Sequence, residues 1–138
     1  SEETGSQSSY RSACAELEEL YQQAPPSGVT LIIVSCCTDA AVFAESHVTL
    51  FRDKTVRVIH LGGAELQAEL SANGEPTGET KLAPDPAAQN NRLDLPSARS
   101  LYSTAQANSV PLVILSRHAA HACRLPRALF DALTSHCG

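Results

Sequence analysis

The sequence is short of several residue types that mark particular classes of protein. Tryptophan and methionine are absent from its 138 residues, aromatic residues make up 4%, and charged residues make up 18%. Its core must therefore be built from aliphatic side chains, and a hydrophobic share of 43% is enough to form one. A chain of this length and composition fits one folded domain and is not expected to be disordered throughout.

Positive charge is also scarce. Ten Lys and Arg stand against fifteen Asp and Glu, so the formal net charge is −5. Nucleic acids and anionic membranes attract basic surfaces, and neither is an expected partner. No apolar run reaches the roughly 18 residues of a membrane span, and Ser1–Ser9 lacks the features of a signal peptide. We therefore expect an intracellular, cytoplasmic protein.

The sequence contains no CxxC pair. Its five cysteines are Cys14, Cys36, Cys37, Cys123 and Cys137. An odd number without paired spacing indicates free thiols in a reducing compartment, with no intrachain disulfide. Cys36 and Cys37 precede an expected helix, where a cysteine is either a reactive thiol or a small buried hydrophobe. His118, His121 and Cys123 only loosely approximate a zinc site, so we assign no metal and no cofactor.

Three mainly apolar runs predict strands that are covered on both faces, as in a parallel sheet. They are Val29–Val34, Thr55–Ile59 and Val110–Leu115. One helix is expected before the first run, from Tyr10. Others are expected between the runs, from a cap at Thr38 and from Pro96 at a first helical turn. This alternation predicts an α/β fold of three layers, α/β/α, with a small, mainly parallel sheet of Rossmann-like type.

The chain divides into a tail and a domain. Residues 1–9 are rich in Ser and Glu and are expected to be a flexible tail, while residues 10–138 form one α/β domain. A long polar insertion near 64–95 is rich in turn residues and is expected to be mobile or to add strands. A last amphipathic helix is expected from Pro126. Three strands make a narrow sheet, so we also expect the domain to belong to a larger protein.

Functional residues are expected where the predicted strands end, because open parallel sheets bind ligands at their carboxyl edge. Those ends are Ser35–Asp39, Leu61–Ala64 and Ser116–His118. Arg117 at the last of these ends either holds an anion or forms a surface ion pair. His118 and His121, one helical turn apart, are either a catalytic base with its neighbour or ordinary exposed side chains.

Four segments, taken in order, resemble the central part of the inosine-uridine-preferring nucleoside hydrolases. Their order and spacing support the resemblance more than any single motif, and it covers roughly Tyr10 to Leu133. The segments are VTLIIVSCCTDAAVFA, VRVIHLGGA, AQNNRLDLPSARSLY and VPLVILSRHAAHACRLPRALFDAL. The resemblance implies a nucleoside-hydrolase-like fold with a sugar-binding site at the carboxyl edge of the sheet.

The resemblance also implies particular site residues. Thr38-Asp39 stand where the family has Thr-Asn, and Gly62-Gly63 follow Leu61 where it has Met-Gly-Gly. Asn90 stands where the family has an Asn that contacts the ribose, four residues before Asp94. The alternatives are an Asn90-Asn91 pair that bonds to backbone and a plain turn at the glycines. The weak ligand-binding candidates are therefore Asn90, Asn91, Asp94, Gly62, Gly63, Thr38 and Asp39.

The sequence departs from the family at the residues that would perform catalysis. Ala88 stands in place of an acid, and Leu82 in place of a second sugar-binding Asn. The family's aspartate cluster, which holds calcium and activates water, has no counterpart, and neither does its closing His-Asp pair. We therefore assign no catalytic residue.

We interpret the chain as a catalytically inactive nucleoside-hydrolase-like domain that serves interaction, assembly or regulation within a larger protein. Its expected partners are another protein or other domains of the parent chain, and a homo-oligomer is a further expectation. The alternatives are a sensor of a nucleoside or sugar, and a fragment of an active nucleoside N-ribohydrolase.

Overall fold

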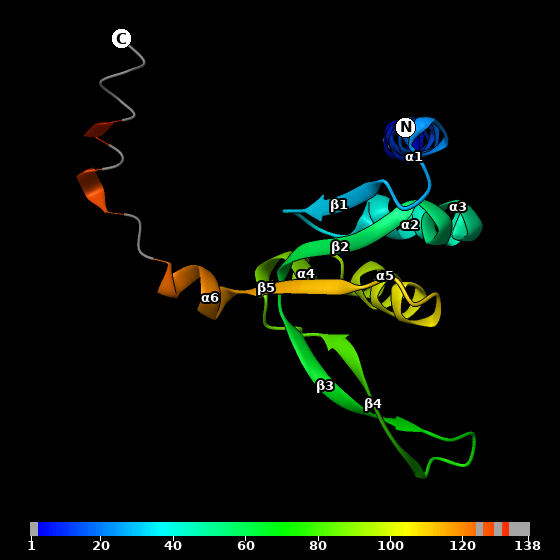
Figure 1. Ribbon diagram of the computed structural model, residues 1–138, viewed down its shortest axis with the longest axis vertical. Helices are drawn as coiled ribbons and strands as arrows, with labels where there is room; N and C mark the ends of the chain where they lie inside the picture. The colour runs from blue at the N-terminus through cyan, green and yellow to red at the C-terminus, as the bar shows by residue number, and fades with distance from the viewer. Residues whose placement is uncertain (1–2, 124–125, 129–130, 133–138) are drawn as a thin grey trace.

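The computed structural model describes residues 3–123, 126–128 and 131–132. Helices and strands alternate along most of the chain (Figure 1). They are α1 (Glu3–Gln23), β1 (Val29–Ile33), α2 (Thr38–Ser46), α3 (Val48–Lys54), β2 (Thr55–Gly62), β3 (Ala64–Leu70), β4 (Pro76–Pro84), α4 (Gln89–Leu93), α5 (Leu95–Ala107), β5 (Leu112–Ser116) and α6 (Arg117–Ala122). Among the described residues, no helix combines the length and hydropathy that crossing a bilayer requires.

The central sheet is parallel throughout, in the order β1-β2-β5. This confirms the α/β class and the small, mainly parallel sheet expected from the three apolar runs. Ile32 lies beside Ile59, which in turn lies beside Val113, so one apolar row crosses all three strands. Leu61 and Leu115 form part of the next row on the same face.

The core lies on one face of this sheet only. Ile33 and Val58 are buried against Phe43 of α2 and Leu101 of α5, and Tyr21 of α1 extends the same cluster. The Tyr21 and Phe43 rings lie 4.5 Å apart. Helices α1, α2, α3 and α5 thus form a single layer that buries one set of alternating strand residues.

The opposite face is exposed in the described part of the chain, whose helices pack on one face of the sheet. Four of its side chains, Ile32, Val34, Val113 and Leu115, are 62%, 69%, 40% and 45% exposed. The apolar runs did indicate two apolar faces. Within the described residues, however, the packed helices cover only one, so the second helical layer of the three-layer arrangement is not found there.

A β-bulge sets which residues of β2 face the helices. Val29 pairs with Thr55 but Thr30 pairs with Arg57, so Val56 is the extra residue. The shift places Thr55 on the helix side, where its hydroxyl bonds the Tyr21 hydroxyl at 3.2 Å. After the bulge, Val58 and His60 point into the core, while Arg57 points to the exposed face.

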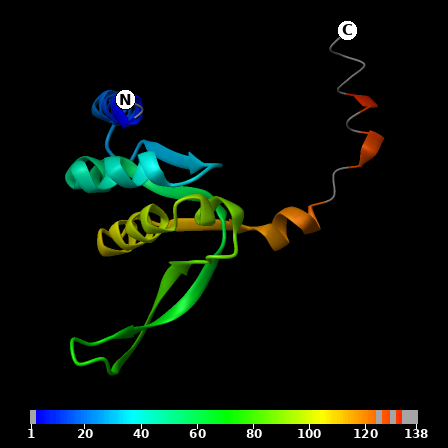
Figure 2. The same cartoon turned by 180° about the vertical axis from the view of Figure 1, so that it is seen from behind.

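The polar insertion forms a β-hairpin, so it adds strands, which is one of the two expectations for this segment. Strands β3 and β4 pair antiparallel around a tight turn in which Gly74 has φ of +80°. The hairpin projects from the body of the domain, and α6 leads away from it elsewhere (Figures 1 and 2). Its mobility stays a prediction.

The hairpin is attached to the domain by a side-chain amide. Gln106 Oε1 accepts from Leu82 N at 2.8 Å, and Gln106 Nε2 donates to Leu82 O at 2.9 Å. These are the two bonds that a neighbouring strand would make with β4, so helix α5 occupies that edge of the hairpin. Leu66 of β3, by contrast, is 74% exposed.

The two ends of the chain differ from the predictions in different ways. Helix α1 already begins at Glu3, so residues 3–9 are helical, and their flexibility stays a prediction. The helix expected from Pro126 falls largely outside the described residues, as does Cys137. The other four cysteines, Cys14, Cys36, Cys37 and Cys123, carry free thiols.

Candidate functional site

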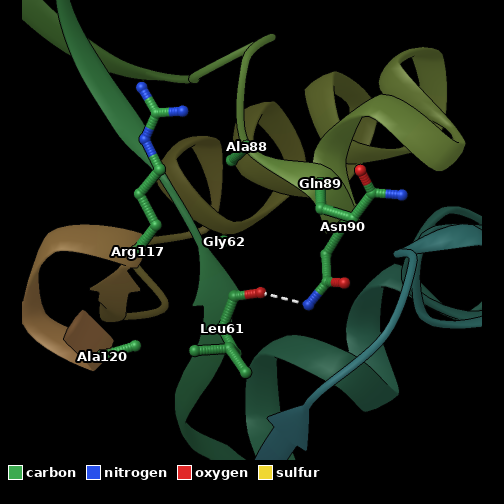
Figure 3. A pocket seen from close by; sticks show the side chains of 7 residues that line it. All are labelled: Leu61, Gly62, Ala88, Gln89, Asn90, Arg117 and Ala120. Atoms are coloured by element: carbon green, nitrogen blue, oxygen red, sulfur yellow. Dashed lines mark hydrogen bonds between the residues drawn. The ribbon is translucent and has the colours of Figure 1, made fainter. Parts of the chain in front are cut away.

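A small open cavity lies at the carboxyl edge of the sheet, between the end of β2, the start of α4 and helix α6 (Figure 3). Its volume is about 220 Å³. Small-molecule pockets usually range from about 300 to 1,000 Å³, so this one has room for a sugar ring or a comparable group. It is lined by Leu61, Gly62, Ala88, Gln89, Asn90, Arg117 and Ala120.

Asn90 joins the ends of two strands and still faces the cavity. Its Nδ2 donates to Leu61 O at 2.5 Å, as Figure 3 shows, and to Val34 O at 3.4 Å. In the described structure nothing donates to its Oδ1, which remains able to accept from a ligand hydroxyl. Asn90 thus links two strand ends and also lines the cavity, and its role as a ligand contact stays a prediction.

Asn91 is a structural residue with no access to the cavity. Its side chain is fully buried, and its Nδ2 donates to Gly63 O at 2.9 Å and to Asp85 O at 2.8 Å. Two carbonyl acceptors fix the amide orientation, so Oδ1 must point the other way. That oxygen is buried without a hydrogen-bond partner.

Close packing explains both glycines. A Cβ at Gly62 would lie 2.6 Å from His60 Cε1 and 2.9 Å from Asn91 Oδ1. A Cβ at Gly63 would lie 2.9 Å from Asp85 Cβ. The glycine pair therefore lets helix α4 and its preceding turn approach the strand end, and only Gly62 also lines the cavity.

Asp94 and Thr38 bond to each other rather than to the cavity. Thr38 Oγ1 donates to Asp94 Oδ2 at 2.6 Å, and Asp94 caps α5 by accepting from Ser97 N at 3.1 Å. The hydrogen bonds from Thr38 and Ser97 lower the pKa of Asp94 below its ordinary value. Asp39 lies exposed in the first turn of α2, where its charge suits the helix dipole.

A buried polar cluster lies directly beneath the site. His60 is fully buried, with Nδ1 3.1 Å from the Tyr102 hydroxyl and Nε2 3.5 Å from Cys37 Sγ. Burial lowers the pKa of His60 and raises that of Cys37 to about 12. The Tyr102 hydroxyl also donates to Gly63 O at 3.3 Å. The cluster therefore consists of neutral groups that connect the core to the strand end.

For the adjacent cysteines, the sequence left open a reactive thiol or a small buried hydrophobe. Cys37 is the buried one. Cys36 is partly exposed, and hydrogen bonds from Thr38 lower the pKa of Cys36. The Thr38 hydroxyl has only one proton to donate, however, and the Asp94 carboxylate is a stronger acceptor for it than the Cys36 sulfur. His118 and His121 are exposed on α6, which buries no residue.

The calcium ion that the family resemblance implies does not fit the donor set. Calcium takes six or more oxygen ligands and favours carboxylates, but the cavity is lined by amides, a guanidinium and apolar side chains. The nearby Asp94 carboxylate is engaged by Thr38 and Ser97. Across the described residues, no three His, Cys, Asp or Glu side chains form a group able to hold a metal.

Comparison with solved structures identifies the fold. The type III effector protein XopQ, solved in complex with adenosine diphosphate ribose, matches with 28% identity over 88% of this chain and a TM-score of 0.68. The effector protein XOO4466 matches with 27% identity over 91% and a TM-score of 0.72. The fold is nucleoside-hydrolase-like. The chain spans about a third of the length of these proteins, 31% of each.

The nucleoside-hydrolase-like fold therefore agrees with the resemblance drawn from sequence. No protein-family model and no curated protein matches the chain. The structure brings Asn90, Gly62 and Arg117 together at the cavity and places Asn91, Gly63, Thr38 and Asp94 in the supporting framework. Gln89 and Ala120 were missed, and their only sequence signal is proximity to Asn90 and Arg117.

Proposed function

We propose that this chain is a non-catalytic nucleoside-hydrolase-like domain that serves as an interaction module, through the exposed face of its parallel sheet. The proposal rests on one observation. Ile32, Val113 and Leu115 are exposed on one face of a sheet of a kind that is normally covered on both faces, and Val34, directly after β1, is exposed as well. Contiguous apolar patches of this kind mark protein contact sites.

The chemistry of the cavity supports a non-catalytic role. Hydrolysis of an N-glycosidic bond needs a group that takes a proton from water and a charge that stabilises the sugar in the transition state. Ala88 stands in the cavity where the family resemblance implies an acid, and the lining holds no carboxylate. Asn90 orients a hydroxyl, but an amide is not a base.

Turnover is tested by release of free base or ribose from inosine and from uridine, with calcium added. The full chain is compared with an Asn90→Ala variant. We expect neither protein to exceed the background rate. Turnover by the natural chain that disappears in Asn90→Ala would reject the non-catalytic part of the proposal.

The interaction role is tested by placing a photo-crosslinking amino acid at Ile32 or, as a matched exposed control, at Leu66 on the hairpin. Both positions are more than 60% exposed. After irradiation in the cells that make the protein, we expect a discrete adduct at Ile32 that Leu66 does not give. Equal labelling at the two positions would reject the exposed face as the contact surface.

A second candidate function is a sensor that binds a ribosyl compound without cleaving it. The free Asn90 Oδ1 and the cationic Arg117 at one cavity favour it, since a ribosyl phosphate carries hydroxyl donors and an anion. XopQ, which shares the fold, was solved with adenosine diphosphate ribose. Calorimetry with ribose, inosine and adenosine diphosphate ribose tests this candidate. Saturable binding that Arg117→Ala weakens would support it.

A further inference from the structure

The turn at the tip of the β3-β4 hairpin contains an asparagine followed by a glycine (Figure 1). Of the four asparagines in the sequence, Asn73 alone precedes a glycine. Asn73 and Gly74 are both exposed, and a Cβ added at Gly74 would meet no atom within 4 Å. The Asn73 side chain makes no hydrogen bond within the described residues, so its amide carbon is open to attack.

The other three asparagine side chains are held in place. Asn90 and Asn91 donate to backbone carbonyls at the end of β2. Asn108 Nδ2 donates to Thr104 O at 2.8 Å, at the end of α5. The residue after each of these asparagines carries a side chain, which obstructs the approach of its backbone nitrogen to the amide carbon. Asn108 is therefore a natural internal comparison for Asn73.

The chemistry open to an Asn-Gly pair is ring closure. The Asn73 Cγ is electrophilic, and the backbone nitrogen of Gly74 can reach it through a five-membered ring. Gly74 presents no Cβ to obstruct this approach, and a glycine backbone reaches more conformations than any other. Asparagine is among the chemically labile residues of proteins for this reason.

The closed turn restrains the attacking nitrogen. Gly74 N donates to Ser71 O at 2.9 Å, and Ser71 N donates to Glu75 O at 2.8 Å. Residues 71–80 are all exposed, so opening the turn breaks a few solvent-exposed hydrogen bonds and uncovers no apolar surface. Segments of this kind lie at the low-stability end of a protein, and their local opening costs little free energy.

We propose that Asn73 is a deamidation site, at which the hairpin tip is converted to aspartate and isoaspartate. Gly74 N gives up its proton and attacks Asn73 Cγ, the bond between Cγ and Nδ2 breaks, and ammonia leaves with a proton. Water then opens the succinimide ring. Opening at Cγ gives aspartate, and opening at the main-chain carbonyl gives isoaspartate.

Both products change the hairpin. Each adds one negative charge to a segment, residues 64–84, that already holds four glutamates and one lysine. Isoaspartate also inserts one carbon into the main chain between Ser71 and Gly74, which breaks the hydrogen bond that closes the turn. The pairing of Leu70 with Pro76 beside the turn is then expected to fray. The modification therefore shortens the hairpin from its tip.

The test is peptide mapping by mass spectrometry of the full chain after incubation at neutral and at mildly alkaline pH. We expect a mass gain of about 1 Da in the peptide that contains Asn73. It should accumulate about tenfold faster than in the peptide that contains Asn108, because only Asn73 precedes a residue without a Cβ. The rate should rise with pH, since Gly74 N must lose its proton, and isoaspartate should be present in the product.

Two variants locate the reaction. Asn73→Gln should abolish the mass gain, because the corresponding ring would have six members. Gly74→Ala should slow it about tenfold, since the added Cβ obstructs the nitrogen. Alanine also strains a turn in which this position has φ of +80°, so both proteins are compared again in urea, where neither turn is formed. The slowing by Gly74→Ala should persist there.

Three results would overturn this inference. Deamidation of Asn73 in urea but not in the folded chain would show that the closed turn protects the site. Equal rates at Asn73 and Asn108 in the folded chain would show that the hairpin tip has no special reactivity. Aspartate without isoaspartate would show direct hydrolysis of the side-chain amide, without a ring.

Discussion

The two faces of the central sheet carry similar side chains and have different surroundings. Ile33 on one face is 7% exposed, and its neighbour Ile32 on the other is 62% exposed. Composition is therefore a poor guide to burial in this strand, because both residues are isoleucine. The difference lies in the helices, which in the described structure bury one face and leave the other to water.

The largest effect is expected at the covered face. Phe43→Ala removes a fully buried ring that packs against Tyr21, and should lower the free energy of unfolding by about 3–5 kcal/mol. Urea denaturation followed by circular dichroism measures it. A loss below about 1 kcal/mol would mean that the helical layer is not closely packed on the sheet.

A smaller loss of stability is expected from a change at the carboxyl edge of the sheet. Gly62→Ala forces a methyl group against the His60 ring and Asn91 Oδ1, and overpacking of this kind costs about 1–3 kcal/mol. The same denaturation experiment measures this loss. Ala64→Gly, directly beyond the glycine pair, removes a methyl group instead of adding one and serves as the comparison. Unchanged stability in Gly62→Ala would show that the strand end yields easily.

The next smaller effect is expected at Asp94, which caps α5 and bonds to Thr38 at the start of α2. Asp94→Ala removes the acceptor of Ser97 N and of the Thr38 hydroxyl, and should cost about 1 kcal/mol. Asp39→Ala, in the first turn of α2, is the matched control and should cost less, about 0.3 kcal/mol. Equal losses in the two variants would contradict the bridging role of Asp94.

Between pH 7.5 and 5, a fall in pH is expected to lower the free energy of unfolding through His60. Burial lowers the pKa of His60, so below about pH 6.5, the ordinary value for histidine, the unfolded chain binds a proton that the folded chain does not. Stability is therefore full above that pH and falls as the pH drops toward the folded-state pKa. Denaturation from pH 7.5 to 5 measures this slope, which His60→Gln should reduce.

The smallest effect is expected on the exposed face. Ile32→Thr replaces an exposed side chain by a smaller β-branched one, so stability should change by no more than about 0.5 kcal/mol. A loss above about 2 kcal/mol would show that Ile32 is already covered in the free chain, and the contrast between the two faces would disappear.

Part of this architecture could be read from the sequence. Mainly apolar runs predicted the three strands and their parallel pairing, and Pro96 marked the start of α5. The missing cover of the second face could not be predicted, because an apolar run shows only that a strand suits burial. Strands in the insertion were only one of two expectations, because Ala64–Pro84 shows turn residues and little apolar alternation.

A cavity lies at the sheet edge where the sequence predicts a ligand site, and the binding of a ligand there stays a prediction. The rule that ligands bind at carboxyl strand ends found Gly62, Asn90 and Arg117. Adjacent asparagines gave no sign that Asn90 would face the cavity while Asn91 turned inward. The bond between Thr38 and Asp94 joins residues 56 apart in sequence, and only the fold brings them together.

The amide of Gln106 protects one position of an otherwise open strand edge. Growth of a β-fibre proceeds by pairing along exposed strand edges. Gln106 already bonds both backbone groups of Leu82 that an incoming strand would need, so this position of β4 is closed to such pairing. A Gln106→Leu change would open it and is expected to make the hairpin more prone to aggregation.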